Sequence, residues 1–163
     1  MEMLAAQVGE MLKSHGLMLA AAESCTGGGV AQAITEIPGS SDWFERGFVT
    51  YANASKVEML GVREETLRQH GAVSEATVRE MAEGALRHSH AHISLAVSGI
   101  AGPAGGTPEK PVGTVFFAWS VRGDATHARK HFLTGNRAEI RAQSVRIALQ
   151  GLLEIGNSLT AIA

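Results

Sequence analysis

The sequence has little cysteine, few aromatic side chains and no long uncharged apolar run. Its single cysteine excludes an internal disulfide, and aromatic residues make up only 5% of the 163 residues. Because it also lacks a signal peptide and an apolar membrane anchor, we expect a soluble protein of the cytoplasm. No low-complexity linker interrupts residues 1–163, so we expect one domain, long enough to bury a core without disulfides or a structural metal.

The sequence also has no large excess of charge of one sign. Fourteen basic residues stand against sixteen acidic ones, which gives a formal net charge of −2, and no basic block occurs. Proteins that bind nucleic acid carry a basic patch or stripe. We therefore expect neither a nucleic acid nor a membrane as a partner.

Hydrophobic periodicity predicts a mixed arrangement of helices and strands. Helical spacing begins at Leu4 and Val8, recurs after residue 29 and around 56–60 and 63–70, and follows Ser74, a good N-cap. A last helix follows Asn136 and Glu139, which are spaced as a capping box. Short apolar runs typical of strands cover residues 17–22, 44–51 and 93–98, and residues 112–121 and 126–133 form a hairpin around a turn. This order predicts an α/β fold, a three-layer α/β/α sandwich on a mixed, mostly parallel sheet with a late antiparallel hairpin.

The first strand runs into a turn of hydroxyl, thiol and glycine residues. In an α/β layer the carboxyl end of a strand opens into a crevice, and the amides of the next helix's first turn point into it unpaired. Ser24, Cys25 and Thr26 are therefore expected where a nucleophile or an anion would be held. Gly27 and Gly28 allow close backbone approach to a ligand. The alternative is a tight strand-to-helix connection with Ser24 or Thr26 as N-cap.

Three strand ends are expected to meet at one edge of the sheet. The first carries Glu23, Ser24, Cys25 and Thr26; the second carries Tyr51, Asn53 and Lys56; the third carries Ser98, Gly99, Gly102, Gly105 and Gly106. Because ligands bind outside the carboxyl ends of strands in open α/β sheets, a shared crevice is predicted. Backbone amides of the third segment could hold a phosphate, although a flexible surface loop is the alternative interpretation.

Tyr51 and Lys56 lie close enough to face one cleft. A lysine partly removed from water can lose its proton near neutral pH and act as base toward a serine, with the tyrosine as proton relay. Such a pair needs no cofactor and no metal, and the histidines lack the spacing of zinc ligands. A solvated lysine at a helix start remains the alternative. Cys25 could be the nucleophile instead, although no histidine in these segments would activate it.

Four segments together resemble one known family. They are Ala22-Glu-Ser-Cys-Thr-Gly-Gly28, Gly47-Phe-Val-Thr-Tyr-Ala-Asn53 leading to Lys56, Gly71-Ala-Val-Ser-Glu75, and Ser98-Gly-Ile-Ala-Gly-Pro103 with Gly105 and Gly106. In this order they resemble the C-terminal domain of the competence-damage-inducible proteins, over roughly residues 4 to 155.

The resemblance implies an amidohydrolase of pyridine-nucleotide recycling. It implies hydrolysis of the carboxamide of nicotinamide mononucleotide to nicotinate mononucleotide and ammonia, and assembly as a homo-oligomer, a dimer or a trimer. Carried over to this sequence, Ser24 resembles the nucleophile, Tyr51 and Lys56 its activating pair, and the segment from Ser98 the substrate-binding loop. Arg137 is a candidate partner for the phosphate. A non-catalytic nucleotide-binding regulatory module is the alternative function, and it would need no Lys56.

Overall fold

The fold is built on a five-stranded sheet with the strand order β2-β1-β3-β4-β5. The structure is a computed structural model and describes residues 1–162. The strands are β1 (Leu19–Glu23), β2 (Phe44–Val49), β3 (Ile93–Gly99), β4 (Thr114–Val121) and β5 (Thr126–Phe132). The helices are α1 (Glu2–Ser14), α2 (Gly29–Thr35), α3 (Asn53–Leu60), α4 (Glu64–His70), α5 (Glu75–Arg87) and α6 (Arg137–Ile162), with a 3₁₀ turn η1 over Ser40–Asp42.

The pairing of the strands confirms the predicted mixed sheet. Strand β1 pairs in parallel with β2 and with β3, whereas β3 with β4 and β4 with β5 pair antiparallel. Four of the five strands therefore point in one direction, and β4 with β5 forms the late hairpin. The carboxyl ends of β1, β2 and β3 lie together at one edge of the sheet.

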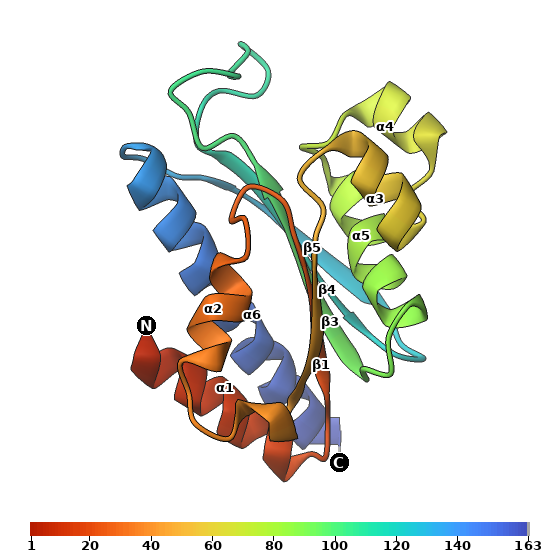
Figure 1. Cartoon of the computed structure of the whole chain (residues 1–163), viewed down its shortest axis with the longest axis vertical. Helices are drawn as coiled ribbons and strands as arrows, with labels where there is room; N and C mark the ends of the chain where they lie inside the picture. The colour runs from red at the N-terminus through yellow and green to blue at the C-terminus, as the bar shows by residue number, and fades with distance from the viewer. Residues whose placement is uncertain (163) are drawn as a thin grey trace.

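Helices cover both faces of the sheet and complete three layers (Figure 1). Helices α1, α2 and α6 pack on one face, and α3, α4 and α5 lie on the other. Successive side chains of β1 alternate between the two layers: Leu19 and Ala21 join the core under α6, while Ala20 and Ala22 join the core under α5. No helix within residues 1–162 is long and apolar enough to cross a membrane.

Two predicted helix starts are confirmed by their capping bonds. The Ser74 hydroxyl accepts a hydrogen bond from the Thr77 amide at 3.2 Å at the start of α5. At the start of α6, the Asn136 amide donates to Glu139 Oε1 at 2.8 Å, and the Glu139 amide donates to Asn136 Oδ1 at 2.9 Å. This reciprocal pair is the capping box that the sequence predicted, and it fixes where the last helix begins.

Strand β2 ends two residues earlier than the predicted range of 44–51. The Thr50 amide still donates to the Glu23 carbonyl at 2.8 Å, but the chain then leaves the sheet and α3 begins at Asn53, before the predicted start at Lys56. The carbonyls of Thr50 and Tyr51 are consequently free of any strand partner. They turn instead toward Lys56, in the first turn of α3.

Candidate active site

A cavity of about 270 Å³ opens at the carboxyl ends of β1 and β3. It is lined by Ser24, Cys25, Tyr51, Lys56, Ser98, Gly99, Gly102, Gly105 and Arg137, all of which were predicted as site residues. Ala72 and Val73, which sequence reasoning did not single out, form part of its wall. The predicted convergence of three strand ends on one crevice is therefore present in the structure.

Ser24 and Lys56 form the chemical centre of this cavity. Lys56 Nζ lies 3.0 Å from Ser24 Oγ and donates to the carbonyl of Thr50 at 2.7 Å and to that of Tyr51 at 3.2 Å. The Lys56 side chain has 0% exposure, and within residues 1–162 no carboxylate forms an ion pair with it. Burial lowers the pKa of the Lys56 ammonium, because the charged form loses its hydration.

This geometry suits a neutral lysine. A neutral amine has two N–H groups and one lone pair. When the two N–H groups are donated to the carbonyls of Thr50 and Tyr51, the lone pair remains for the Ser24 hydroxyl proton. An amine placed in this way can take the proton of a serine hydroxyl.

The Tyr51 phenol takes a different place from the predicted relay. Its side chain is 61% exposed, and its hydroxyl accepts a hydrogen bond from Arg137 Nη2 at 3.2 Å. Arg137 Nη1 also donates to the Gly102 carbonyl at 2.9 Å. Arg137 thus joins Tyr51 to the glycine-rich loop beside the cavity. The contact of Tyr51 with Lys56 is made by its backbone carbonyl and not by its phenol.

Cys25 is a protonated thiol at neutral pH. It is 6% exposed, and burial raises the pKa of the thiol from 9.0 to about 11. A thiol is a poor nucleophile until it loses its proton. The environment of Cys25 therefore favours Ser24 as the nucleophile.

Six predicted site residues do not line the cavity: Glu23, Thr26, Gly27, Gly28, Asn53 and Gly106. Asn53 is exposed and lines a separate hollow with Val57. Gly106 lies against Val112, whose backbone nitrogen would be 2.8 Å from a Cβ at that position. None of these six residues borders the cavity.

The expectation that the start of α2 holds an anion needs correction. The carboxylate of Glu23 accepts hydrogen bonds from the amides of Gly28, Val30 and Ala31 at 3.2, 2.9 and 3.0 Å. These donors of the first turn already have a negatively charged partner from the protein itself. They are therefore not available to a substrate.

Arg141 lies beside the turn that carries Ser24, and it was not predicted from the sequence. It lies one turn after Arg137 in α6, and it donates to the carbonyl of Cys25 at 3.0 Å and to that of Thr26 at 3.2 Å. The spacing of four between the two arginines places them on one helix face and could have indicated a shared location.

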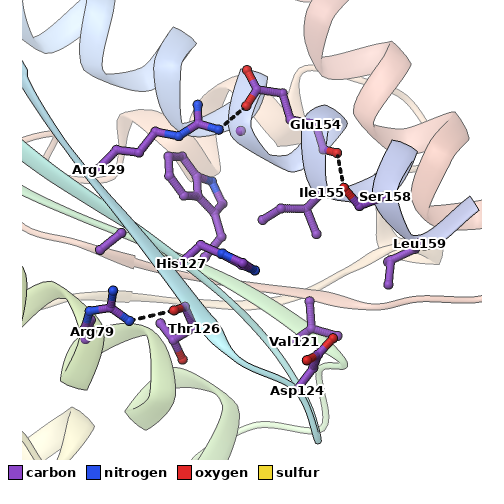
Figure 2. Close-up of a pocket in the computed structure, with 13 residues that line it drawn as sticks. Arg79, Val121, Asp124, Thr126, His127, Arg129, Glu154, Ile155, Ser158 and Leu159 are labelled. Carbon is purple, nitrogen blue, oxygen red and sulfur yellow. Dashed lines mark hydrogen bonds and ion pairs between the residues drawn. The ribbon is translucent and has the colours of Figure 1, made fainter. Parts of the chain in front are cut away.

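A larger hollow, of about 440 Å³, lies at the other end of the sheet between β5 and the last turns of α6 (Figure 2). Arg129 forms an ion pair with Glu154 at this hollow, and the Ser158 hydroxyl donates to the Glu154 carbonyl. The Thr126 hydroxyl is bonded to Glu83. Among the described residues that line this hollow there is no lysine, and the contact of a serine with a buried lysine is found in the smaller cavity.

The chain belongs to the CinA C-terminal domain family, whose model matches residues 1–155. Among its relatives, a protein of Escherichia coli K12 called nicotinamide-nucleotide amidohydrolase PncC is 55% identical, covering 91% of this chain and 90% of that protein. A homologue of the same name in Pseudomonas putida is 50% identical, covering 94% and 95% of the two chains. A CinA-like protein of Akkermansia muciniphila is 53% identical over 88% of this chain, which spans 34% of that longer protein.

Solved structures show the same fold. The crystal structure of the competence/damage inducible protein CihA from Agrobacterium tumefaciens matches with a TM-score of 0.91 and 48% identity, covering 94% of this chain and 93% of that one. A CinA superfamily protein from Klebsiella pneumoniae 700603 matches with a TM-score of 0.91 and 40% identity over 98% of each chain. The predicted family and fold class are thereby confirmed.

Proposed function

We propose that the protein hydrolyses the carboxamide of nicotinamide mononucleotide to nicotinate mononucleotide and ammonia. The substrate is inferred from the names of relatives whose matches cover nine-tenths of the chain or more. The observation that carries the proposal is the 3.0 Å contact between Ser24 Oγ and the fully buried Lys56 Nζ. A serine beside a desolvated lysine is suited to acyl transfer, the reaction class of an amidase.

In the proposed mechanism Lys56 is the immediate base. Neutral Lys56 takes the Ser24 proton, and Ser24 Oγ attacks the amide carbon to form a tetrahedral intermediate. The Lys56 ammonium then gives its proton to the departing nitrogen, and ammonia leaves the acyl-enzyme. Lys56 next takes a proton from water, whose oxygen attacks the ester; the proton returns to Ser24 as nicotinate mononucleotide is released.

The backbone amide of Cys25 is the proposed donor to the negatively charged oxygen of the tetrahedral intermediate. Cys25 directly follows the nucleophile and lines the cavity, and within residues 1–162 its amide donates no hydrogen bond to another residue. The amide lies against the thiol of the same residue, which is a weak acceptor, so it remains a donor for a ligand oxygen. The first-turn amides of α2, which Glu23 occupies, have no part in this step.

The direct test of the function is release of ammonia from nicotinamide mononucleotide by the purified protein, with nicotinate mononucleotide identified by anion-exchange chromatography. Equimolar formation of both products supports the amidase. Saturable binding of the nucleotide without either product would instead support the non-catalytic nucleotide-binding module.

We propose that Arg137 binds the phosphate of the substrate. Its guanidinium bridges the Tyr51 hydroxyl and the Gly102 carbonyl at the cavity wall, and such a group forms charge-assisted hydrogen bonds with a phosphate. Arg137→Gln is expected to raise KM for nicotinamide mononucleotide about tenfold or more, the value of one charged hydrogen bond of ~1.5 kcal/mol.

The comparison substrate for this variant is free nicotinamide, which has no phosphate. Its residual hydrolysis is expected to be equal in the wild type and in Arg137→Gln. An equal loss of activity on both substrates would show that Arg137 does not bind the phosphate. A substitution at Gly102 is a poorer test, because φ is +79° there and a Cβ would lie 2.5 Å from Val112 Cγ1.

Removal of metal ions is expected to leave turnover unchanged. The proposed activation uses Lys56 alone, and within residues 1–162 no three His, Cys, Asp or Glu side chains are grouped to hold a metal ion. The measurement is the rate of ammonia release before and after dialysis against EDTA. Loss of activity that only a divalent ion restores would overturn the Ser24–Lys56 mechanism.

We also propose a homo-oligomer, a dimer or a trimer, that works in the cytoplasm. This assembly is what the family resemblance implies for a nucleotide-recycling enzyme. Light scattering on the purified protein measures the mass directly, and a monomer at micromolar concentration would exclude the oligomer.

A further inference from the structure

The turn that carries the nucleophile is held by two charged side chains that do not border the cavity. The first is Glu23, whose carboxylate is 1% exposed. Besides the amides of Gly28, Val30 and Ala31, it accepts a hydrogen bond from the Thr26 hydroxyl at 2.6 Å. Thr26 is itself 1% exposed. Four hydrogen bonds to one buried carboxylate fix the turn relative to α2.

The second side chain is Arg141, which approaches from α6. Its Nε donates to the Cys25 carbonyl at 3.0 Å, and its Nη2 donates to the Thr26 carbonyl at 3.2 Å. The turn has room for this guanidinium because residue 27 is a glycine, whose added Cβ would lie 3.3 Å from Arg141 Nη2. Gly27 also has a φ of +57°, a conformation that favours glycine.

The hydrogen bonds to these carbonyls determine where the amides of the same turn point. A trans peptide is planar, with its C=O and N–H directed oppositely. Since the Cys25 carbonyl faces Arg141, the Thr26 N–H points away from Arg141. The Thr26 carbonyl also faces Arg141, so the N–H of the same peptide, that of Gly27, points away from Arg141 and donates to the Ser24 carbonyl at 3.0 Å. The Cys25 N–H lies opposite the Ser24 carbonyl in its own peptide and therefore points away from Gly27.

We propose that Glu23 and Arg141 are positioning residues that aim the Cys25 amide at the oxygen that becomes negative when Ser24 attacks. This inference rests on the proposed amidase function. A donor that is already aimed costs no reorganisation during the reaction, and it acts on the transition state more than on the bound substrate. Loss of either positioning residue therefore reduces kcat and leaves KM nearly unchanged.

The first experiment compares Arg141→Met with Arg141→Lys and with Arg146→Met, which removes an exposed arginine from the same helix. Arg141→Met is expected to lower kcat about 100-fold, as loss of one such donor does. KM for nicotinamide mononucleotide should stay within about threefold. Arg141→Lys should recover part of kcat, and Arg146→Met should match the wild type.

A binding measurement separates positioning from a general loss of structure. Pyridine-3-boronic acid forms a tetrahedral adduct with an active serine and imitates the attacked amide. Its affinity is expected to fall in Arg141→Met by about the factor lost in kcat, while the affinity for the product nicotinate mononucleotide is unchanged. A boronate affinity equal to that of the wild type would overturn the proposal, as would a parallel loss of product binding.

The second experiment addresses Glu23 through Thr26, because replacing the buried carboxylate itself endangers folding. Thr26→Val removes the hydroxyl that contacts Glu23, and Thr26→Ser keeps it. We expect Thr26→Val to lower kcat and boronate affinity together, and Thr26→Ser to restore both. Equal values for the two variants would exclude Glu23 from the positioning. If the wild type forms the boronate adduct but releases no ammonia from the nucleotide, the proposed substrate is wrong. The positioning role of Glu23 and Arg141 would then still be tested by the boronate affinities of the variants.

Discussion

Ser24→Ala is expected to abolish ammonia release from nicotinamide mononucleotide, with kcat lowered by about 10⁴-fold or more. The change removes one oxygen, whose hydrogen-bond partner among the described residues is Lys56, and takes no volume from the core. Lys56 keeps the carbonyls of Thr50 and Tyr51 as acceptors. Circular dichroism and thermal melting should therefore show a folded protein whose Tm is close to that of the wild type.

The matched control is Cys25→Ala at the neighbouring position. Its thiol has a pKa raised to about 11 and stays protonated at neutral pH, so its removal is expected to leave substantial activity. An inactive Cys25→Ala beside an active Ser24→Ala would reverse the assignment of the nucleophile. Mass spectrometry of the enzyme quenched during turnover should find the acyl group on Ser24.

Lys56→Met is expected to lower kcat by about 10³-fold or more, because it removes the general base while roughly keeping the length of the side chain. In the wild type only the neutral amine is active, so kcat/KM should rise with pH as the ammonium loses its proton. Burial lowers the pKa of Lys56, so the midpoint of this rise should lie below the usual lysine value of about 10.4.

The pH profile of kcat/KM measures the role of Lys56 independently of the mutation. In Lys56→Met the residual activity should no longer follow the rise seen in the wild type. An activity that falls as pH increases through the same range would show that the protonated lysine is required, and it would contradict the assigned role as base.

The layers and the location of the site could be predicted from the sequence because they depend on periodicity. Apolar runs with intervening helices define a sandwich, and parallel strands bring their carboxyl ends to one edge. Ser24, Lys56 and Ser98 are all close to such ends, so their convergence followed without knowledge of any side-chain direction. The capping box at Asn136 was equally local, since its two bonds join residues three apart.

The orientation of side chains around the site could not be predicted in this way. Whether Glu23 faces a substrate or the start of α2 depends on how the chain turns after β1. The spacing of residues in the sequence does not indicate the path of that turn. The predicted start of α3 was three residues late, and this error was enough to misplace Asn53. Successive side chains on a helix point about 100° apart, so the face on which a residue lies depends on where the helix begins. The contacts of Arg141 join segments 115 and 116 residues apart, beyond the reach of a local pattern.

The early end of β2 affects how the site tolerates sequence change. Lys56 is held by the main-chain carbonyls of Thr50 and Tyr51, and every amino acid carries such a carbonyl. A substitution at either position changes a side chain without removing an acceptor from the lysine. The base is therefore protected from point substitutions at residues 50 and 51, and it is sensitive instead to insertions or deletions that alter the path of the backbone between Val49 and Asn53.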